Sequence, residues 1–213
     1  MKQYKITFSD DYSKSEIEMV TNHINIEFPK LLRMHNEENI EIEFLSFYVE
    51  NEYLYFSAAA DEPRKMWFKL NRFNNFSDTI HNYLKDTLSH EFHHMIRWNY
   101  RKRFNLSELL INEGLAILFT MTINQTKCPP YIKEVTNQDV EKLLPLIKRD
   151  LYNENFNHRI WQKGNKEYGI PISFAYSFGF KLVKDFYEQN PKMDIRNSFG
   201  IDCNLFIPAY LKD

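Results

Sequence analysis

The first part of the chain carries apolar residues at the spacing of a helix. Between Ser13 and about His35 they recur every three or four positions, at Ile17, Val20, Ile24, Phe28 and Leu31. This spacing places them on one face of an α-helix. Pro29 lies inside the segment, and proline removes a backbone donor, so we expect the helix to be kinked or divided there.

The pattern becomes strand-like after this helix. The segment Ile40–Val49 begins with apolar and charged residues in alternation, as a half-buried strand does. Two further segments, EYLYFSAAA at 52–60 and MWFKL at 66–70, are rich in the aromatic residues that strands favour. We therefore expect a small layer of strands in the first part of the chain.

Helical patterns return from Ser77 onward, with Ser77 or Asp78 as the expected N-cap. This helix should run to about Tyr100, and Ser107 is the possible cap of the next one. Three more helices are expected, at about Ser107–Ile123, Asn137–Tyr152 and Ile172–Gln189.

Strands that are followed by a run of helices predict the α+β class. With 213 residues the chain is long enough for one compact domain with a sizeable core, or for two closely packed lobes. We expect a single domain, 1–213, with an N-terminal α/β lobe at about 1–76 and a helical half at about 77–213.

Composition excludes some classes of partner. The formal net charge is -2, which leaves no field over the whole protein to attract nucleic acid or an anionic membrane. The N-terminus lacks the apolar stretch of a secretory signal, and no apolar run approaches the about 20 residues of a membrane helix. Cys128 and Cys203 lie far apart and form no CxxC pair. We expect a cytoplasmic protein that has no nucleic-acid or membrane partner.

The main chemical signal is HEFHH at 90–94, which satisfies H-E-x-x-H. On a helix, His90 and His94 lie one turn apart on one face, so two imidazoles can hold one metal ion. Glu91 projects about 100° around the helix from His90, where it can reach a water without being a ligand. A zinc ion that lowers the pKa of that water, with Glu91 as general base, is the chemistry this spacing suits. The alternative is a helix whose histidines are only structural.

A catalytic zinc ion takes a third protein ligand and keeps an open position. The next helix offers Glu113 within the apolar segment LLINEGLAILF, where an unpaired carboxylate would be costly. An antiparallel return of this helix would bring Glu113 to the histidines. Gly114 costs about 1 kcal/mol relative to Ala in a helix, so we expect a close approach at that position. The three ligands predict one Zn²⁺ ion per chain.

These motifs resemble a known family. HExxH with NEG 18 residues after His94 is similar to the gluzincin zinc peptidases, and more closely to the YjaZ-like bacterial predicted Zn-dependent proteases. The latter pair an HE-aromatic-HH helix and an EGLA helix with a later Tyr-x-x-Gly, here Tyr176 and Gly179. The resemblance covers roughly Ser77 to Asn190. It implies a zincin-like fold with the active-site cleft between the N-terminal lobe and the helical half.

The resemblance also implies roles: His90, His94 and Glu113 as zinc ligands, and Glu91 as general base. The chain departs from thermolysin-like enzymes at Ile117, where they carry an Asp that orients a histidine. It also lacks the G-x-M-x-N strand by which one-zinc aminopeptidases hold a free amine. The missing strand favours an endopeptidase, or an enzyme of undefined specificity, over one that trims N-termini, and the expected substrate is a peptide or protein.

Tyr176 is the candidate to donate a hydrogen bond to the oxyanion, and its alternative role is that of a core aromatic residue. Three other residues compete with it for this role, namely Tyr168, His158 and Arg159. His93 also shares a face with His90, and we interpret it as a packing residue or one that supports the ligands.

Two further expectations concern the flanks of the metal helix. Arg97 and the basic run 101–103 should lie in solvent and compensate the C-terminal dipole of that helix. From the layout of the resembling families, the strands with Tyr53, Tyr55 and Trp67 are expected to form the upper lip of the cleft, where a peptide could add as an edge strand.

The sequence therefore predicts a zinc metallopeptidase. The alternative is a zinc-binding regulatory or interaction protein with little or no turnover. A protein without metal is the third possibility. The oligomeric state is not indicated.

Overall fold

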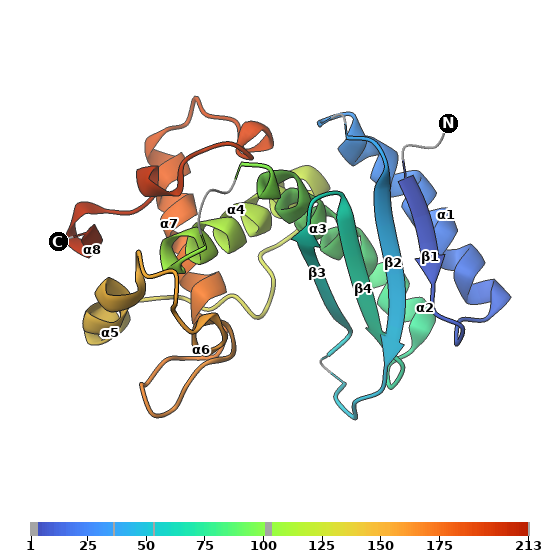
Figure 1. Ribbon diagram of the computed structural model, residues 1–213, viewed down its shortest axis with the longest axis horizontal. Helices are drawn as coiled ribbons and strands as arrows, with labels where there is room; N and C mark the ends of the chain where they lie inside the picture. The colour runs from blue at the N-terminus through green and yellow to red at the C-terminus, as the bar shows by residue number, and fades with distance from the viewer. Residues whose placement is uncertain (1–3, 36, 53, 101–103, 213) are drawn as a thin grey trace. The chain divides into compact units, whose positions relative to one another are not determined.

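The computed structural model describes residues 4–35, 37–52, 54–100 and 104–212. It has a four-stranded sheet in the first part of the chain and mostly helices in the rest, which confirms the α+β class (Figure 1). The chain forms two compact units, 1–99 and 100–213. The helix that carries His90 and His94 thus belongs to the first unit, whereas the sequence placed the start of the helical half at about residue 77.

The sheet has the order β1-β2-β4-β3. Its strands are β1 (Tyr4–Phe8), β2 (Ile40–Phe47), β3 (Phe56–Glu62) and β4 (Lys65–Asn71). β1, β2 and β4 are parallel, and β3 pairs antiparallel with β4 at one edge. β1 was not predicted, although Tyr4, Ile6 and Phe8 alternate with polar residues, which is a strand pattern.

The helices of this unit are α1 (Lys14–Leu32), α2 (Phe76–Thr79), the π-helical turn η1 (Ile80–Leu84) and α3 (Lys85–Trp98). α1 starts from a capping box between Ser13 and Glu16. Helix α1 is not divided at Pro29. This residue lies in the last turn, so only a few residues of the helix follow it. The N-cap of α2 is Asn75, whose side chain accepts from Asp78 N, so the prediction of Ser77 or Asp78 was wrong.

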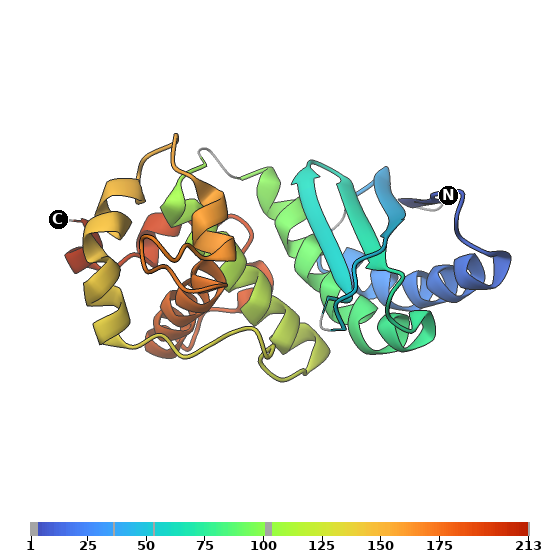
Figure 2. The same ribbon diagram turned by 90° about the horizontal axis from the view of Figure 1, so that it is seen from below.

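α1 and α3 lie on the same face of the sheet (Figures 1 and 2). The alternation in β2 buries Ile40, Ile42 and Phe44 completely. Phe44 stacks on Phe68 of β4 with ring centroids 5.1 Å apart, and Phe28 of α1 meets Phe92 of α3 edge-on at 5.8 Å. Helix α3 is therefore held against the sheet by its apolar residues, which fixes the side of the helix that carries the histidines.

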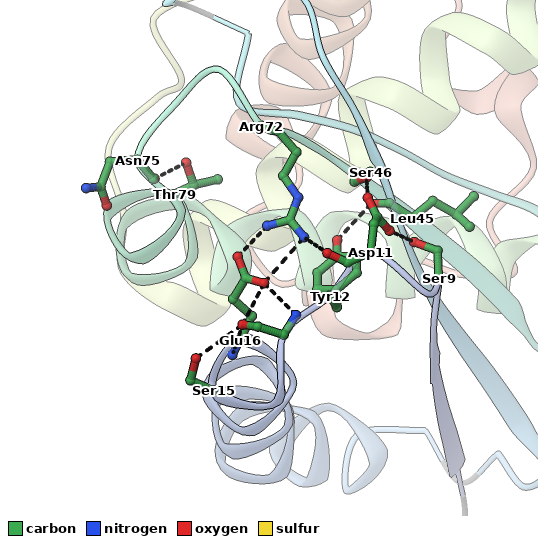
Figure 3. Close-up of polar contacts among 11 residues, drawn as sticks. Ser9, Asp11, Tyr12, Ser15, Glu16, Leu45, Ser46, Arg72, Asn75 and Thr79 are labelled. Carbon is green, nitrogen blue, oxygen red and sulfur yellow. Dashed lines mark hydrogen bonds and ion pairs between the residues drawn. The ribbon is translucent and has the colours of Figure 1, made fainter.

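A polar network closes one end of this unit (Figure 3). Arg72, just after β4, forms an ion pair with Glu16 and donates to the carbonyl oxygen of Asp11. Its guanidinium lies over the ring of Tyr12, 4.4 Å from the centroid. The network joins the β1–α1 loop to the end of β4, where a charged, bidentate donor satisfies several acceptors at once.

The second unit is built around α4 (Leu106–Asn124), which packs against α7 (Phe174–Gln189). The remaining elements are α5 (Asn137–Asp150), α6 (His158–Lys163), the 3₁₀ turns η2 (Ile195–Asn197) and η3 (Cys203–Leu205), and α8 (Ala209–Lys212). α6 was not predicted. The cap of α4 is Asn105, whose side chain accepts from Glu108 N and from the Ser107 hydroxyl, so Ser107 is not the cap.

By length and composition α4 could cross a membrane, contrary to the expectation from the sequence. However, 72% of its apolar window is buried inside the structure. Burial in a core requires the same apolar character, so α4 is the core helix of the second unit. Gly114 of α4 meets Gly179 of α7, so the predicted close approach at Gly114 is confirmed.

Candidate metal centre

Helix α3 places two imidazoles on one side, one turn apart. The Nε2 atoms of His90 and His94 are 2.9 Å apart, and the two rings are nearly perpendicular, with centroids 4.5 Å apart. Two nitrogens that bind one tetrahedral zinc ion lie about 3.3 Å apart. Both rings therefore present the same nitrogen to one point at nearly the spacing of zinc ligands, and the pair fits a metal ion.

Glu91 follows His90 on the same helix and is 5% exposed. A carboxylate in such surroundings is costly without polar partners, so its burial indicates that it has a specific role. The Glu91 side chain projects about 100° around the helix axis from His90, so it does not share the face on which the two imidazoles converge. Glu91 is therefore a buried carboxylate on the same helix as the imidazole pair.

His93 lies on the buried side of α3 and is completely buried. Its pKa lies well below the ordinary value, first because of burial and then because of the nearby His94, Arg97 and His90. A neutral, buried His93 has its ring centroid 6.3 Å from that of His94. His93 therefore lies beside the pair on the buried side of α3.

Arg97 is only 3% exposed, so the prediction that it compensates the helix dipole in solvent was wrong. It lies one turn after His93 on the buried side of α3, because residues four apart share one face of a helix. The basic run 101–103, predicted to share that role, lies outside the described residues.

Glu113 lies in the middle of α4 and is 6% exposed. Its carboxylate oxygen Oε1 accepts a hydrogen bond from the Gln162 side chain of α6, with Nε2 3.4 Å away. The same Nε2 is 3.4 Å from the phenol oxygen of Tyr176 on α7. Gln162 thus links Glu113 to Tyr176, and three helices meet at this amide.

Gln162 could not be recognised from the sequence. A glutamine in a short segment carries no motif, and its only signal was that it directly follows Trp161, an aromatic residue suited to anchoring a helix. Once folded, Trp161 is completely buried and donates its indole N–H to Asp150 of α5 at 2.9 Å.

The residues that compete with Tyr176 lie elsewhere in the second unit. Tyr168 is 44% exposed, and the Arg149 guanidinium lies over its ring. His158 and Arg159 are exposed residues of the first turn of α6, and His158 packs against Phe104. Tyr176, in contrast, contacts the same amide that bonds to Glu113.

Two imidazoles and a carboxylate are the donor set of many catalytic zinc ions. His90 and His94 supply two such imidazoles on α3, and Glu113 is the carboxylate that the sequence predicted as the third ligand. Carboxylate and imidazole donors also suit other divalent metals, so the donor set by itself indicates a candidate metal site in an α+β protein without specifying the metal.

The chain matches the family model described as "Predicted Zn-dependent protease (DUF2268)" over residues 20–207. It therefore belongs to this family of predicted zinc-dependent proteases, consistent with the YjaZ-like resemblance of its motifs. The match reaches beyond the segment that carries the resemblance and includes most of the sheet. No curated protein and no solved structure matches the chain.

Proposed function

We propose that the protein is a zinc metallopeptidase of zincin-like fold that hydrolyses peptide bonds. The observation that carries the proposal is the convergence of the His90 and His94 Nε2 atoms at 2.9 Å on one side of α3. It occurs in a chain whose family is described as predicted Zn-dependent proteases, and zinc is the metal that this name suggests.

In the proposed site, His90, His94 and Glu113 hold one zinc ion per chain, although Glu113 belongs to the second compact unit. A bound zinc ion would supply Lewis acidity and lower the pKa of water towards neutrality. The support for Glu113 is its buried carboxylate, which is expensive in an apolar helix unless it has strong partners.

Glu91 acts as general base in this proposal. Its carboxylate takes the proton of the attacking water and later delivers it to the leaving amine. Tyr176 donates a hydrogen bond to the oxygen that becomes negative as the tetrahedral intermediate forms. The link from Tyr176 through Gln162 to Glu113 supports this role over the roles of Tyr168, His158 and Arg159.

The proposed substrate is a peptide or protein segment that is cut internally, by a cytoplasmic enzyme without nucleic-acid or membrane partners. β3 is an edge strand of the sheet, which leaves a row of backbone groups for an extended peptide to pair with. Tyr55 stacks on Tyr83 of η1 with ring centroids 4.2 Å apart, and Tyr53 lies outside the described residues.

The test combines metal analysis with a mixed peptide library. The proposal expects about one zinc per chain and internal cleavage of peptides, which a chelator abolishes and added zinc restores. Zinc at that level without cleavage would favour the alternative, a zinc-binding regulatory or interaction protein. Far less than one metal ion per chain after purification with zinc would contradict both.

A further inference from the structure

Gln162 makes both of its side-chain contacts through one atom. Its Nε2 is 3.4 Å from Glu113 Oε1 and 3.4 Å from the Tyr176 phenol oxygen. A carboxylate only accepts hydrogen bonds, so the amide must turn its NH₂ group towards Glu113. This group carries two N–H donors, which serve the carboxylate and the phenol together.

Each of the two hydrogen bonds restricts the orientation of the group that accepts it. The hydrogen bond from Gln162 to Oε1 of Glu113 restricts the rotation of the carboxylate group. The Tyr176 oxygen accepts from Gln162, so its own O–H is directed elsewhere as a donor. Both contacts are long, as hydrogen bonds of catalytic groups often are before substrate is bound.

Helix α6 is too short to hold Gln162 by itself, and its neighbours fix it. Trp161 is completely buried, its indole N–H bonds to Asp150, and its ring packs on Phe174 of α7 with centroids 5.8 Å apart. The backbone oxygen of Gln162 accepts from Ser173 N at 3.0 Å. α6 is therefore tied to α5 and α7 on both sides of the Gln162 side chain.

We infer that Gln162 is a positioning residue that orients the Glu113 carboxylate for metal binding and the Tyr176 hydroxyl for its donor role. The inference rests on the proposed function, because it takes Glu113 as a ligand. Hydrogen-bond partners of metal ligands fix the ligand's orientation, and losing one typically weakens metal binding by about 10- to 100-fold.

The test is the affinity for zinc, measured by competition with a chromogenic chelator. Gln162→Met keeps the length of the side chain and removes both donors, and we expect the Kd for zinc to rise by about 10- to 100-fold. Gln162→Asn keeps the amide but is one methylene shorter, and it should behave in the same way. Lys163→Met, an exposed neighbour on α6, is the control and should bind zinc like the parent protein.

The role towards Tyr176 has its own readout, which is kcat at saturating zinc. Gln162→Met should lower kcat in the parent but hardly at all in a Tyr176→Phe background, because the two residues act together. Equal losses in both backgrounds would contradict action through Tyr176.

These measurements distinguish a failure of the positioning role of Gln162 from a failure of the proposed function. If the parent binds zinc and cleaves peptides while folded Gln162→Met binds zinc within about twofold of the parent, well short of the expected loss, only the positioning role is wrong. A parent that binds no zinc contradicts the proposed function itself.

Discussion

Gly114 of α4 and Gly179 of α7 lie backbone to backbone. A Cβ atom at Gly114 would fall against the carbonyl oxygen of Gly179, and one at Gly179 against the carbonyl oxygen of Leu110. Both would be closer than the 3.0 Å that real Cβ atoms keep. Neither obstacle is a flexible side chain, so the two helices can meet this closely only without side chains at these positions. Glu113 and Tyr176 lie beside this contact, one on each helix.

Gly114→Ala should destabilise the protein, although alanine normally favours a helix by about 1 kcal/mol. The added methyl group must push α4 from α7, and we expect a loss of about 3 kcal/mol in the free energy of unfolding. Urea unfolding followed by circular dichroism measures it. Thr122→Ala, on the exposed side of α4, is the control and should change stability little. A Gly114→Ala protein as stable as the parent would contradict the close approach.

Glu91→Gln should keep zinc and lose peptide hydrolysis. The amide has the shape of the carboxylate but cannot take a proton, and general-base catalysis contributes about 10²- to 10⁴-fold. Zinc content and kcat, measured on the same preparation, test both halves. Glu141→Gln makes the same chemical change at an exposed position of α5 and should retain activity. Cleavage by Glu91→Gln at the parent's rate would show that another group is the base.

His90→Ala and His94→Ala should each abolish stable zinc binding. Each removes one of the two converging nitrogens, and the loss should exceed the about 100-fold that follows when only an outer hydrogen-bond partner of a ligand is removed. Isothermal titration with zinc gives the comparison. His81→Ala is the control, because this exposed histidine bonds to the Ser77 carbonyl oxygen instead. If His90→Ala and His81→Ala bound zinc equally, the site would lie elsewhere.

Because of Asp150, the free energy of unfolding of the protein should depend on pH in the acidic range. Burial raises its pKa, but the hydrogen bonds from Arg149 and Trp161 outweigh burial, and the net pKa is lowered. A lowered pKa stabilises the fold above the unfolded-state value of about 3.9, and this stabilisation is lost as the pH falls through the folded-state value. We expect Asp150→Asn to cost about 1–3 kcal/mol near neutral pH.

The cost of Asp150→Asn should shrink as the pH falls below about 4, because the carboxylate then takes up a proton first in the unfolded chain and, below its lowered folded-state pKa, in the folded protein. Urea unfolding of both proteins, followed by tryptophan fluorescence between pH 3 and 7, gives the difference. Glu167→Gln removes one negative charge from an exposed loop and is the control. A difference that stays constant over this range would show that the charge of Asp150 is not what stabilises α6.

The elements that the sequence predicted well are those with long periodic patterns. The apolar face of α1 and the alternation in β2 led to nearly the observed bounds. The caps were less predictable, because Asn75 and Asn105 compete with nearby Ser and Asp residues that cap equally well. Helix α6 was missed because its single turn and a half has no period, and it is held by Asp150 instead.

The sequence by itself determined the geometry that is local to one helix. His90 and His94 converge because residues four apart share a helix face, and Glu91 projects to the side for the same reason. The sequence also indicated a close approach at Gly114, because glycine destabilises a helix interior unless another backbone must come close there. Only the tertiary structure decided which backbone Gly114 meets, that His93 and Arg97 are buried, and that Gln162 joins Glu113 to Tyr176. These relationships join residues far apart in the chain, and the packing of helices against one another, which no local pattern encodes, brings them together.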